Sequence, residues 1–286
     1  MEIVSKASEL QVFLGKVTEG RSLGFVPTMG ALHEGHISLV KKALRENDSV
    51  ICSIFVNPAQ FNDPEDLDRY PKRLEEDIDK LSKAGCKLLF TPTVDEIYPE
   101  GYKAKKYDFG PLDKVMEGEK RPGHFDGVAS VVSRLFSIVK PQKAYFGEKD
   151  FQQLAIIKSL VLQDGLDIEI IGCPIHREPD GLAMSSRNLL LNKEARMAAP
   201  RIYKRLIEIR NMAPANSISS IKEWAIDVFE QDPELELEYI QIANPQNLLP
   251  SSCWSESSTH IICIACFAGS IRLIDNLLLE IKKEEV

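Results

Sequence analysis

His33 and His36 are the residues of this chain whose types and spacing point most directly to chemistry. They end the segment Pro27–His36, which follows an apolar run at Leu23–Val26. The run predicts a short buried strand, and we expect Pro27 to end it because proline has no N–H for the ladder. A helix is predicted next, from apolar residues at Ile37, Val40 and Leu44.

The predicted turn between strand and helix has the features of a polyphosphate site. Gly30 and Gly35 let a ligand approach the backbone closely. The first turn of the helix has unpaired N–H groups and a partial positive charge that attract phosphate. The two imidazoles, three residues apart, share a helix face and can donate to phosphate oxygens. The alternatives are a helix cap with a surface histidine, or a zinc site, although metalloprotease helices carry H-E-x-x-H.

Ten residues, Pro27-Thr28-Met29-Gly30-Ala31-Leu32-His33-Glu34-Gly35-His36, resemble the signature of the pantoate–β-alanine ligase family. The H-x-G-H core is shared by a wider nucleotidyltransferase superfamily, which includes class I aminoacyl-tRNA synthetases. The resemblance implies that His36 is a proton donor, although a purely electrostatic role fits the sequence equally well. It also implies that eight residues bind ATP: Met29, Gly30, Ala31, Leu32, His33, Glu34, Gly35 and His36.

The composition is that of an ordinary globular chain. Its 286 residues are 44% hydrophobic with a net charge of −8. The length suggests one large domain or two smaller ones, and the acidic balance argues against a nucleic-acid partner. We expect no membrane span, because no apolar stretch is long enough to cross a bilayer, and the N-terminus has no apolar targeting core.

Six cysteines are scattered along the chain. Cys263-x-x-Cys266 could be a redox or metal pair. Its neighbours are isoleucine, alanine and phenylalanine, so we interpret it as part of a core strand. Free thiols fit a reducing cytosol, and we expect a cytoplasmic protein.

A second buried strand is predicted at Ser49–Val56, with Asn57 and Gln60 directly after it. Ligands of open α/β sheets bind at the carboxyl ends of strands, so both amides could meet a small polar substrate. A turn capped by Asn57 is the alternative. The V-N-P-x-Q-F pattern is similar to that of the family, and the resemblance implies that Gln60 contacts both pantoate and β-alanine.

Two further regions lie before the middle of the chain. A helix with an acidic outer face is predicted from Leu74 to near Gly85, and a solvated face is its simplest interpretation. The resemblance implies that Asp77 holds the Mg²⁺ that accompanies ATP. Residues 100–126 are rich in glycine, proline and charge, and we interpret them as a mobile cover over the site. An insertion without a role is the alternative, and Arg121 and His124 are possible contacts.

The motif Gly147-Glu148-Lys149-Asp150-Phe151-Gln152-Gln153 follows a strand predicted at Lys143–Phe146. Lys149 can place a point charge on phosphate, and Asp150 can cap the next helix or hold a ribose. Alone, the motif is typical of a capped helix start. Its similarity to the family's version implies that Gly147, Glu148, Lys149 and Asp150 contact ATP and that Gln153 contacts pantoate.

A third motif, Met184-Ser185-Ser186-Arg187-Asn188, follows a strand predicted at Ile168–Gly172. Two hydroxyls and an arginine suit triphosphate oxygens, since arginine stays charged and can be bidentate. A serine-capped helix start is the alternative for the serines. The motif resembles the second signature loop of the superfamily, and the resemblance implies ATP contacts from His176, Met184, Ser185, Ser186 and Arg187.

The fold class expected is α/β: a Rossmann-type parallel sheet covered by helices, followed by a smaller α+β lid domain. We place the domains at 1–180 and 181–286. From Asn192 the pattern predicts a long helix, a second helix at Ile218–Phe229 and strands at Leu235–Ala243 and His260–Phe267. The sequence Arg-Leu-Ile-Asp-Asn at 272–276 is the main match to the family in this half.

The activity that the resemblance implies is condensation of pantoate with β-alanine through a pantoyl adenylate, releasing AMP and pyrophosphate. ATP is a substrate, Mg²⁺ accompanies it, and a homodimer is a family expectation. The implied catalytic residues are His33, His36, Lys149 and Arg187. Three alternatives stay open: a nucleotidyltransferase with another acceptor, a nucleotide sensor without catalysis, and a metallohydrolase. Gln60 and Gln153 argue against the first, because other acceptors would not need them.

Overall fold

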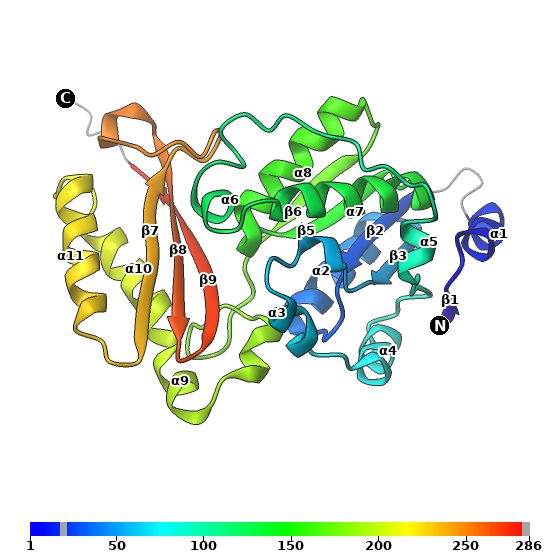
Figure 1. Ribbon diagram of the computed structural model, residues 1–286, viewed down its shortest axis with the longest axis horizontal. Helices are drawn as coiled ribbons and strands as arrows, with labels where there is room; N and C mark the ends of the chain where they lie inside the picture. Colours follow the sequence, from blue (N-terminus) through cyan, green and yellow to red (C-terminus); the bar gives the residue numbers. More distant parts are fainter. Residues whose placement is uncertain (18–21, 282–286) are drawn as a thin grey trace. The chain divides into compact units, whose positions relative to one another are not determined.

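The computed structural model describes residues 1–17 and 22–281, which form two compact units (Figure 1). The first unit comprises Met1–Phe109, Arg121–Glu148 and Gln153–Ile175, and the second comprises Gly110–Lys120, Lys149–Gln152 and the chain from His176. The second unit therefore also takes two short segments from within the first half of the sequence. The predicted domains 1–180 and 181–286 stay a proposal about organisation along the chain.

The first unit is built on a six-stranded sheet in which every neighbouring pair is parallel, in the order β1-β4-β3-β2-β5-β6. Helices on both faces of such a sheet bury its strands, which explains the short apolar runs in the sequence. The predicted Rossmann-type parallel sheet is confirmed. The strands are β1 Glu2–Val4, β2 Leu23–Thr28, β3 Ser49–Ile54, β4 Leu88–Phe90, β5 Lys143–Gly147 and β6 Glu169–Cys173.

Pro27 does not end β2, contrary to the prediction. The strand continues to Thr28, whose backbone oxygen accepts a hydrogen bond from Phe55 N at 3.0 Å on the β3 side. Successive residues of a strand alternate between its two neighbours, so Pro27 faces the β5 side. Pairing with β5 ends at Phe25, opposite Ala144. The missing N–H of Pro27 therefore costs no ladder hydrogen bond.

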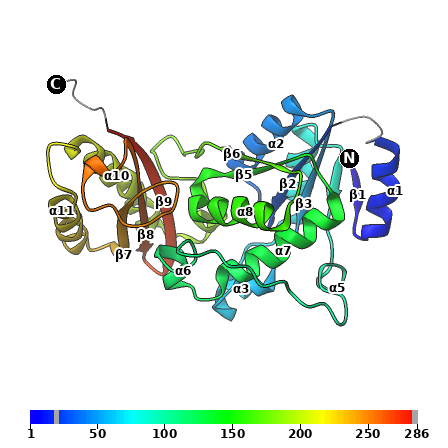
Figure 2. The same ribbon diagram turned by 90° about the horizontal axis from the view of Figure 1, so that it is seen from above.

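Helices cover the sheet of the first unit on two faces, with α2 Glu34–Glu46 on one and α7 His124–Val139 on the other (Figure 2). On the α7 face, Phe136 meets Phe25 and Phe146 edge to face, each with ring centroids 6.4 Å apart. Burying a side chain such as Phe25 contributes roughly 1.5–3 kcal/mol. The other helices of this unit are α1 Ala7–Val17, η1 Pro58–Gln60, α3 Pro64–Arg69, α4 Leu74–Lys83, α5 Val94–Ile97 and most of α8 Phe151–Asp164. The turn η2 Glu148–Asp150 and the first two residues of α8 include the segment Lys149–Gln152, which belongs to the second unit.

Predicted helices in this unit are largely confirmed. The helix expected near Leu74–Gly85 is α4. Residues 1–20 carry a mildly amphipathic pattern that predicts an opening helix, and the structure has α1 there, preceded by β1. Residues 18–20 of that prediction lie outside the described residues. Within the described residues, no helix has the length and apolar character needed to cross a membrane.

The stretch 100–126 is only partly irregular, because it contains α6 Met116–Lys120 and the start of α7. Its first part is held against the end of α8. Tyr107 donates its hydroxyl to Asp164 Oδ2 at 2.8 Å, and Asp108 N donates to Gln163 Oε1 at 3.3 Å. The interpretation as a mobile cover stays a prediction. These hydrogen bonds hold residues 107 and 108 to α8, so only the rest of the stretch can move without breaking them.

The second unit has a three-stranded antiparallel sheet in the order β7-β8-β9, namely β7 Leu235–Ala243, β8 Thr259–Ala268 and β9 Ile271–Glu280. The helices α10 Pro200–Met212 and α11 Ile218–Glu230 pack against it (Figure 1). Both Cys263 and Cys266 are buried free thiols on β8, which confirms the core-strand interpretation. Smaller elements are η3 Ser186–Leu190, α9 Lys193–Ala198 and η4 Trp254–Glu256.

The single long helix predicted from Asn192 is wrong. The chain forms α9 and α10, which meet at Ala199, and Pro200 is the first residue of α10. Proline suits a first helical position because its missing N–H has no partner there in any case. The same missing N–H prevents α9 from continuing through this point.

Candidate active site

The turn after β2 places His33 and His36 at the start of α2. His33 is the N-cap, and its Nδ1 accepts from Gly35 N at 3.1 Å. His36 Nδ1 accepts in return from His33 N at 3.3 Å, which closes a capping box. The ring centroids are 4.0 Å apart. Since both Nδ1 atoms accept, the neutral tautomer of each ring carries its proton on Nε2. The cap interpretation is therefore correct for His33, and the two imidazoles lie next to each other, while their role at a polyphosphate stays a prediction.

The loop between β2 and α2 has an unusual backbone. Gly30 has φ +84°, and Ala31 has φ +49°, a left-handed conformation that is costly for a residue with a Cβ. Asp77 of α4 holds this segment, because its Oδ2 accepts from Ala31 N at 2.8 Å and its Oδ1 accepts from Leu32 N at 2.7 Å. The Mg²⁺ role predicted for Asp77 stays a prediction, and the structure gives its carboxylate backbone partners.

Asn57 is a buried centre of hydrogen bonds after β3. Its Oδ1 caps η1 by accepting from Ala59 N at 3.3 Å, and it also accepts from the Tyr98 hydroxyl at 2.9 Å. Its Nδ2 donates to Gln60 Oε1 at 3.2 Å. The Gln60 amide in turn donates to Met29 Sδ at 2.9 Å. The cap interpretation of Asn57 is therefore correct, and Asn57 orients the side chain of Gln60 beside the loop of Met29.

Two side chains, one just before α7 and one at its first residue, hold the backbone oxygen of Gln60. His124 Nδ1 lies 2.7 Å from the Gln60 carbonyl oxygen, and Arg121 Nη2 donates to the same oxygen at 3.3 Å. Gly127 allows this approach, because a Cβ at that position would lie 2.1 Å from Ala59 O. Arg121 and His124, named from the sequence as possible contacts, therefore support the backbone that carries Gln60.

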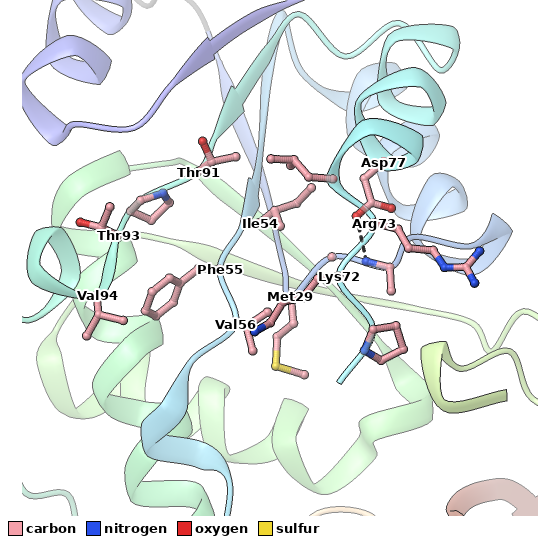
Figure 3. A pocket seen from close by; sticks show the side chains of 15 residues that line it. Met29, Ile54, Phe55, Val56, Lys72, Arg73, Asp77, Thr91, Thr93 and Val94 are labelled. Atoms are coloured by element: carbon pink, nitrogen blue, oxygen red, sulfur yellow. Dashed lines mark hydrogen bonds between the residues drawn. The ribbon is translucent and has the colours of Figure 1, made fainter. Parts of the chain in front are cut away.

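A cavity of about 300 Å³ opens beside the loop at the carboxyl ends of β2, β3 and β4. This is near the lower end of the volume that small-molecule sites occupy. Figure 3 shows Met29, Asp77 and Lys72 around it, with the Asp77 hydrogen bond to the loop drawn as a dashed line. Its other labelled lining residues are Ile54, Phe55, Val56, Arg73, Thr91, Thr93 and Val94.

The second unit contains Lys149 and Asp150. The Lys149 ammonium lies 3.7 Å from Asp150 Oδ1. The backbone oxygen of Lys149 accepts a hydrogen bond from Asn276 Nδ2 of β9 at 2.9 Å. The short 3-10 turn η2 at Glu148–Asp150 replaces a simple helix start in this motif.

The segment from His176 to Met184 is a tight hairpin in the second unit. Met184 N donates to His176 O at 3.0 Å, and Arg177 bridges to Ala183. Arg177 is bidentate to Asp275 of β9, at 2.6 and 2.9 Å, and its guanidinium lies 3.6 Å from the centre of the Tyr203 ring. Such pairs are strong and directional. The hairpin is thus held to β9 at its base.

The serines after the hairpin have different environments. Ser185 is the N-cap of η3, with its Oγ accepting from Arg187 N at 3.2 Å, whereas Ser186 is buried. The serine-capped start offered as an alternative is therefore correct for Ser185. The hydroxyl of Ser185 accepts from Arg187 N and keeps its own O–H as a donor, and the ATP role of Ser185, Ser186 and Arg187 stays a proposal.

Burial is the main cause of the pKa shifts of three groups near these residues. Burial raises the pKa of Asp77, and the N–H groups of Leu32 and Ala31 oppose that rise. Burial also raises the pKa of Asp275, against the effect of Arg177. The pKa of Tyr98 rises to about 12, again mainly because of burial. Tyr98 is therefore protonated at neutral pH and can donate to Asn57.

The structure groups the predicted residues in two sets. The first unit contains the segment Met29–His36 together with Gln60, Gly147, Glu148 and Gln153, and the second contains Lys149, Asp150, His176 and Met184–Arg187. Sequence reasoning missed Lys80, whose ammonium donates to Leu32 O at 2.6 Å. It also missed Gln152, which binds the backbone oxygens of Leu112 and Val115 at 2.6 and 2.8 Å. Gln152 was named as part of its motif, but neither its burial nor its backbone partners leave a periodic signal in the sequence.

Comparison with known protein families gives a match over nearly the whole chain. The family described as pantoate-beta-alanine ligase matches residues 2–278. A pantothenate synthetase of Porphyromonas gingivalis is 46% identical over 281 residues, covering 98% of this chain and 100% of that protein. One from Flavobacterium psychrophilum is 44% identical over 282 residues, with the same coverage of 98% and 100%.

Solved structures agree with these relatives. A pantothenate synthetase from Thermus thermophilus is similar with a TM-score of 0.91 at 45% identity, covering 97% of this chain and 99% of that chain. A pantoate-beta-alanine ligase from Francisella tularensis, complexed with beta-gamma ATP and beta-alanine, is similar with a TM-score of 0.82 at 37% identity, covering 97% of each chain.

Proposed function

This chain belongs to the pantoate–β-alanine ligase family, and from that premise we propose how its residues carry out the reaction. The protein is a ligase that joins pantoate to β-alanine and consumes ATP. A carboxylate is a poor acyl donor, so it must first gain a better leaving group. The proposed route does this by transfer of AMP.

In the first step, an oxygen of the pantoate carboxylate attacks the α-phosphorus of ATP. The bond from that phosphorus to the bridging oxygen breaks, and pyrophosphate leaves with the bonding electrons. In the second step, the β-alanine amine attacks the acyl carbon and the bond to the AMP oxygen breaks. The amine loses a proton, and the products are pantothenate and AMP.

The observation that carries this proposal is the capping box of His33 and His36 at the start of α2. It holds two imidazoles 4.0 Å apart where helix N–H groups and the helix dipole already favour anions. In the neutral tautomer of each ring the N–H is at Nε2, and we assign that group to the phosphates. Charge develops on the phosphate oxygens and on pyrophosphate in the first step, and fixed donors stabilise it without reorganisation.

The remaining phosphate contacts are proposed for the second unit. Lys149 and Arg187 supply positive charge, and Ser185 and Ser186 supply hydroxyls, in line with the family motifs. Further ATP contacts are proposed for Gly147, Glu148, Asp150, His176 and Met184. These groups position ATP and offset its charge, and catalysis comes from positioning and electrostatics together.

Pantoate is assigned to Gln60 and Gln153, and β-alanine to Gln60. The support for Gln60 is its fixed geometry, since Asn57 orients its carboxamide and His124 holds its backbone oxygen. A fixed amide favours one orientation of the acceptor acid and so raises the frequency of productive attack.

Mg²⁺ is proposed to enter as its complex with ATP, because Mg²⁺ commonly binds substrate phosphates and keeps several waters. We do not assign Asp77 as its ligand in this geometry, because each of its carboxylate oxygens accepts a backbone N–H and the residue is only 1% exposed. No step of the proposal therefore depends on a metal held by this residue.

The test uses pantoate labelled with ¹⁸O in its carboxylate. With ATP and Mg²⁺, the protein should release pyrophosphate, and addition of β-alanine should yield AMP and pantothenate. One labelled oxygen should appear in AMP, because the acyl–oxygen bond breaks in the second step. Release of ADP and phosphate instead would overturn the adenylate route, and ATP binding without pyrophosphate release would favour the sensor. Replacing pantoate by another hydroxy acid tests acceptor choice.

Two expectations of the family complete the proposal: a homodimer and a cytoplasmic location. Free thiols in all six cysteines are compatible with a reducing compartment. Light scattering at micromolar concentration and fractionation of the host cell would check them. A monomer mass, or recovery outside the cytoplasm, would contradict the respective expectation.

A further inference from the structure

Asp77 connects α4 to the loop that carries His33 by two short hydrogen bonds to consecutive backbone N–H groups. The distances are 2.8 Å from Ala31 N and 2.7 Å from Leu32 N. One turn away on the same helix, Lys80 donates to the backbone oxygen of Leu32 at 2.6 Å. Two side chains of α4 therefore bind both polar groups of the Leu32 peptide backbone.

The loop needs such support. Gly30 and Ala31 both have positive φ, a conformation that is unfavourable for a residue with a Cβ such as Ala31. Hydrogen bonds to a charged acceptor are among the stronger ones in proteins, and Asp77 accepts two of them from this backbone. Leu32 directly precedes His33, so fixing its amide also fixes the backbone from which the N-cap side chain projects.

The neighbouring acidic residues on α4 behave differently. Glu76 is exposed and lies 3.3 Å from Arg73, and Asp79 is exposed and pairs with Lys83 at 2.6 Å. These are solvated ion pairs of the kind that contribute little. Asp77 is the acidic residue of this turn that points into the protein, toward the loop and the cavity beside it (Figure 3).

We propose that Asp77 is a positioning residue for the adenylation step, and that its carboxylate holds Ala31 and Leu32 rather than Mg²⁺. We call the hydrogen bonds that Asp77 and Lys80 make with the backbone of Ala31 and Leu32 the clamp. The clamp keeps His33 and His36 in positions from which their rings contact the phosphates of ATP. This inference rests on the proposed function for its catalytic consequence. Its structural part, the rigidity of residues 30–33, stands without any activity.

The first test is amide hydrogen exchange without ATP or Mg²⁺. Asp77→Asn replaces one acceptor oxygen by an NH₂ group, which faces a backbone N–H instead of accepting from it. Exchange at Ala31 and Leu32 should rise about tenfold or more in the variant. The matched control Asp79→Asn removes a charge from the same helix, where Asp79 pairs with Lys83, and should leave that exchange unchanged. An unchanged rate in Asp77→Asn would overturn the clamp whether or not the protein is a ligase.

The second test separates positioning from metal binding. For Asp77→Asn, the kcat of pyrophosphate release should fall about tenfold or more, and the apparent Mg²⁺ constant should stay within twofold of the wild-type value. Recovery of activity at high Mg²⁺, with a raised Mg²⁺ constant, would overturn the proposal in favour of a metal ligand. A wild-type protein without pyrophosphate release would refute the proposed function, while the exchange result would still decide the clamp.

Lys80→Met provides a variant that cannot remove a metal ligand. It abolishes the hydrogen bond to Leu32 O and keeps an unbranched side chain. The clamp requires faster exchange in residues 31–33 and a lower kcat in this variant, with an unchanged Mg²⁺ constant. If circular dichroism shows that Asp77→Asn does not fold, Lys80→Met is the variant that tests the clamp. Unchanged exchange in residues 31–33 of Lys80→Met would then refute the clamp.

Discussion

Asn276 donates from its side-chain Nδ2 to the backbone oxygen of Lys149 at 2.9 Å, joining residues 127 positions apart in the sequence. The preceding residue, Asp275, binds Arg177 at the base of the 176–184 hairpin. Two adjacent residues of β9 therefore hold Lys149 and the hairpin that leads into the Met184–Asn188 motif. The Arg-Leu-Ile-Asp-Asn match in the C-terminal half gains a physical reason from this arrangement.

Asn276→Ala should weaken ATP use without changing pantoate binding. The substitution leaves the Lys149 carbonyl without this donor, and a buried hydrogen bond of this kind contributes about 0.5–1.5 kcal/mol. We expect the KM for ATP to rise about threefold to tenfold, which pyrophosphate-release kinetics would measure. Asn247→Ala, at an exposed asparagine of the same unit, is the control. An equal rise in the KM for pantoate would indicate that the substitution disturbs the whole active site and not ATP binding in particular.

Gly127→Ala should impair pantoate binding through the backbone of η1. The added Cβ would lie 2.1 Å from Ala59 O, so η1 must move, and Gln60 moves with it. Overpacking of this kind costs about 1–3 kcal/mol of stability. We expect a lower melting temperature and a KM for pantoate that rises more than the KM for ATP, measured by calorimetry and steady-state kinetics.

The control for this glycine is Gly15→Ala. A Cβ at Gly15 meets nothing within 4 Å, and the residue lies within α1. Alanine favours a helix over glycine by about 1 kcal/mol, so this variant should be slightly more stable with unchanged kinetics. If Gly127→Ala behaves in the same way, then the close packing of α7 on η1 does not position Gln60.

The two roles offered for His36 can be separated with two substitutions. His36→Ala removes both the capping acceptor and the Nε2–H donor, and we expect pyrophosphate release to fall about 10²-fold or more. Glutamine at this position keeps an acceptor for His33 N, as in ordinary capping boxes, and keeps an N–H donor. A purely electrostatic role predicts that His36→Gln recovers most activity, whereas proton donation predicts that it does not.

The measurements for His36 are the kcat of adenylation and its pH profile. Both variants should retain the far-ultraviolet circular dichroism of the wild type, since the cap contributes about 0.5–2 kcal/mol. Full activity of His36→Ala would remove this histidine from the reaction.

The order of elements was accessible from the sequence because parallel strands buried on both faces are short apolar runs. Leu235–Ala243 is β7 with the predicted bounds, and the predicted strand at Lys143–Phe146 differs from β5 by one residue. The start of α2 was also predictable, since the segment that ends in His33 and His36 follows a strand and leads into a periodic helix. These elements were predictable because hydrophobic periodicity and helix start signals are local features of the sequence.

Contacts between distant segments were not accessible in the same way. Asp77 belongs to an acidic helix start whose other members face solvent, and the sequence alone gives no sign that one of them turns inward. The continuation of β2 through Pro27 depends on where its pairing with β5 ends. The break at Ala199 and Pro200 could have been predicted, because proline stops a helix at the preceding residue.

Asp164→Asn should destabilise the protein at neutral pH but not in acid. Burial raises the pKa of Asp164, but hydrogen bonds from Lys105 and Tyr107 lower it more, so the net shift is downward from 3.8. A lowered folded pKa means that the charged form stabilises the fold above the unfolded pKa, and this stabilisation is lost as pH falls through the folded pKa. The difference in unfolding free energy between wild type and variant should therefore be constant near pH 7 and shrink below about pH 4. Urea unfolding at several pH values would measure it, with Asp79→Asn as the control for an exposed ion pair. A difference that persists unchanged in acid would show that Asp164 acts through packing, and that its charge does not hold Lys105 and Tyr107 against α8.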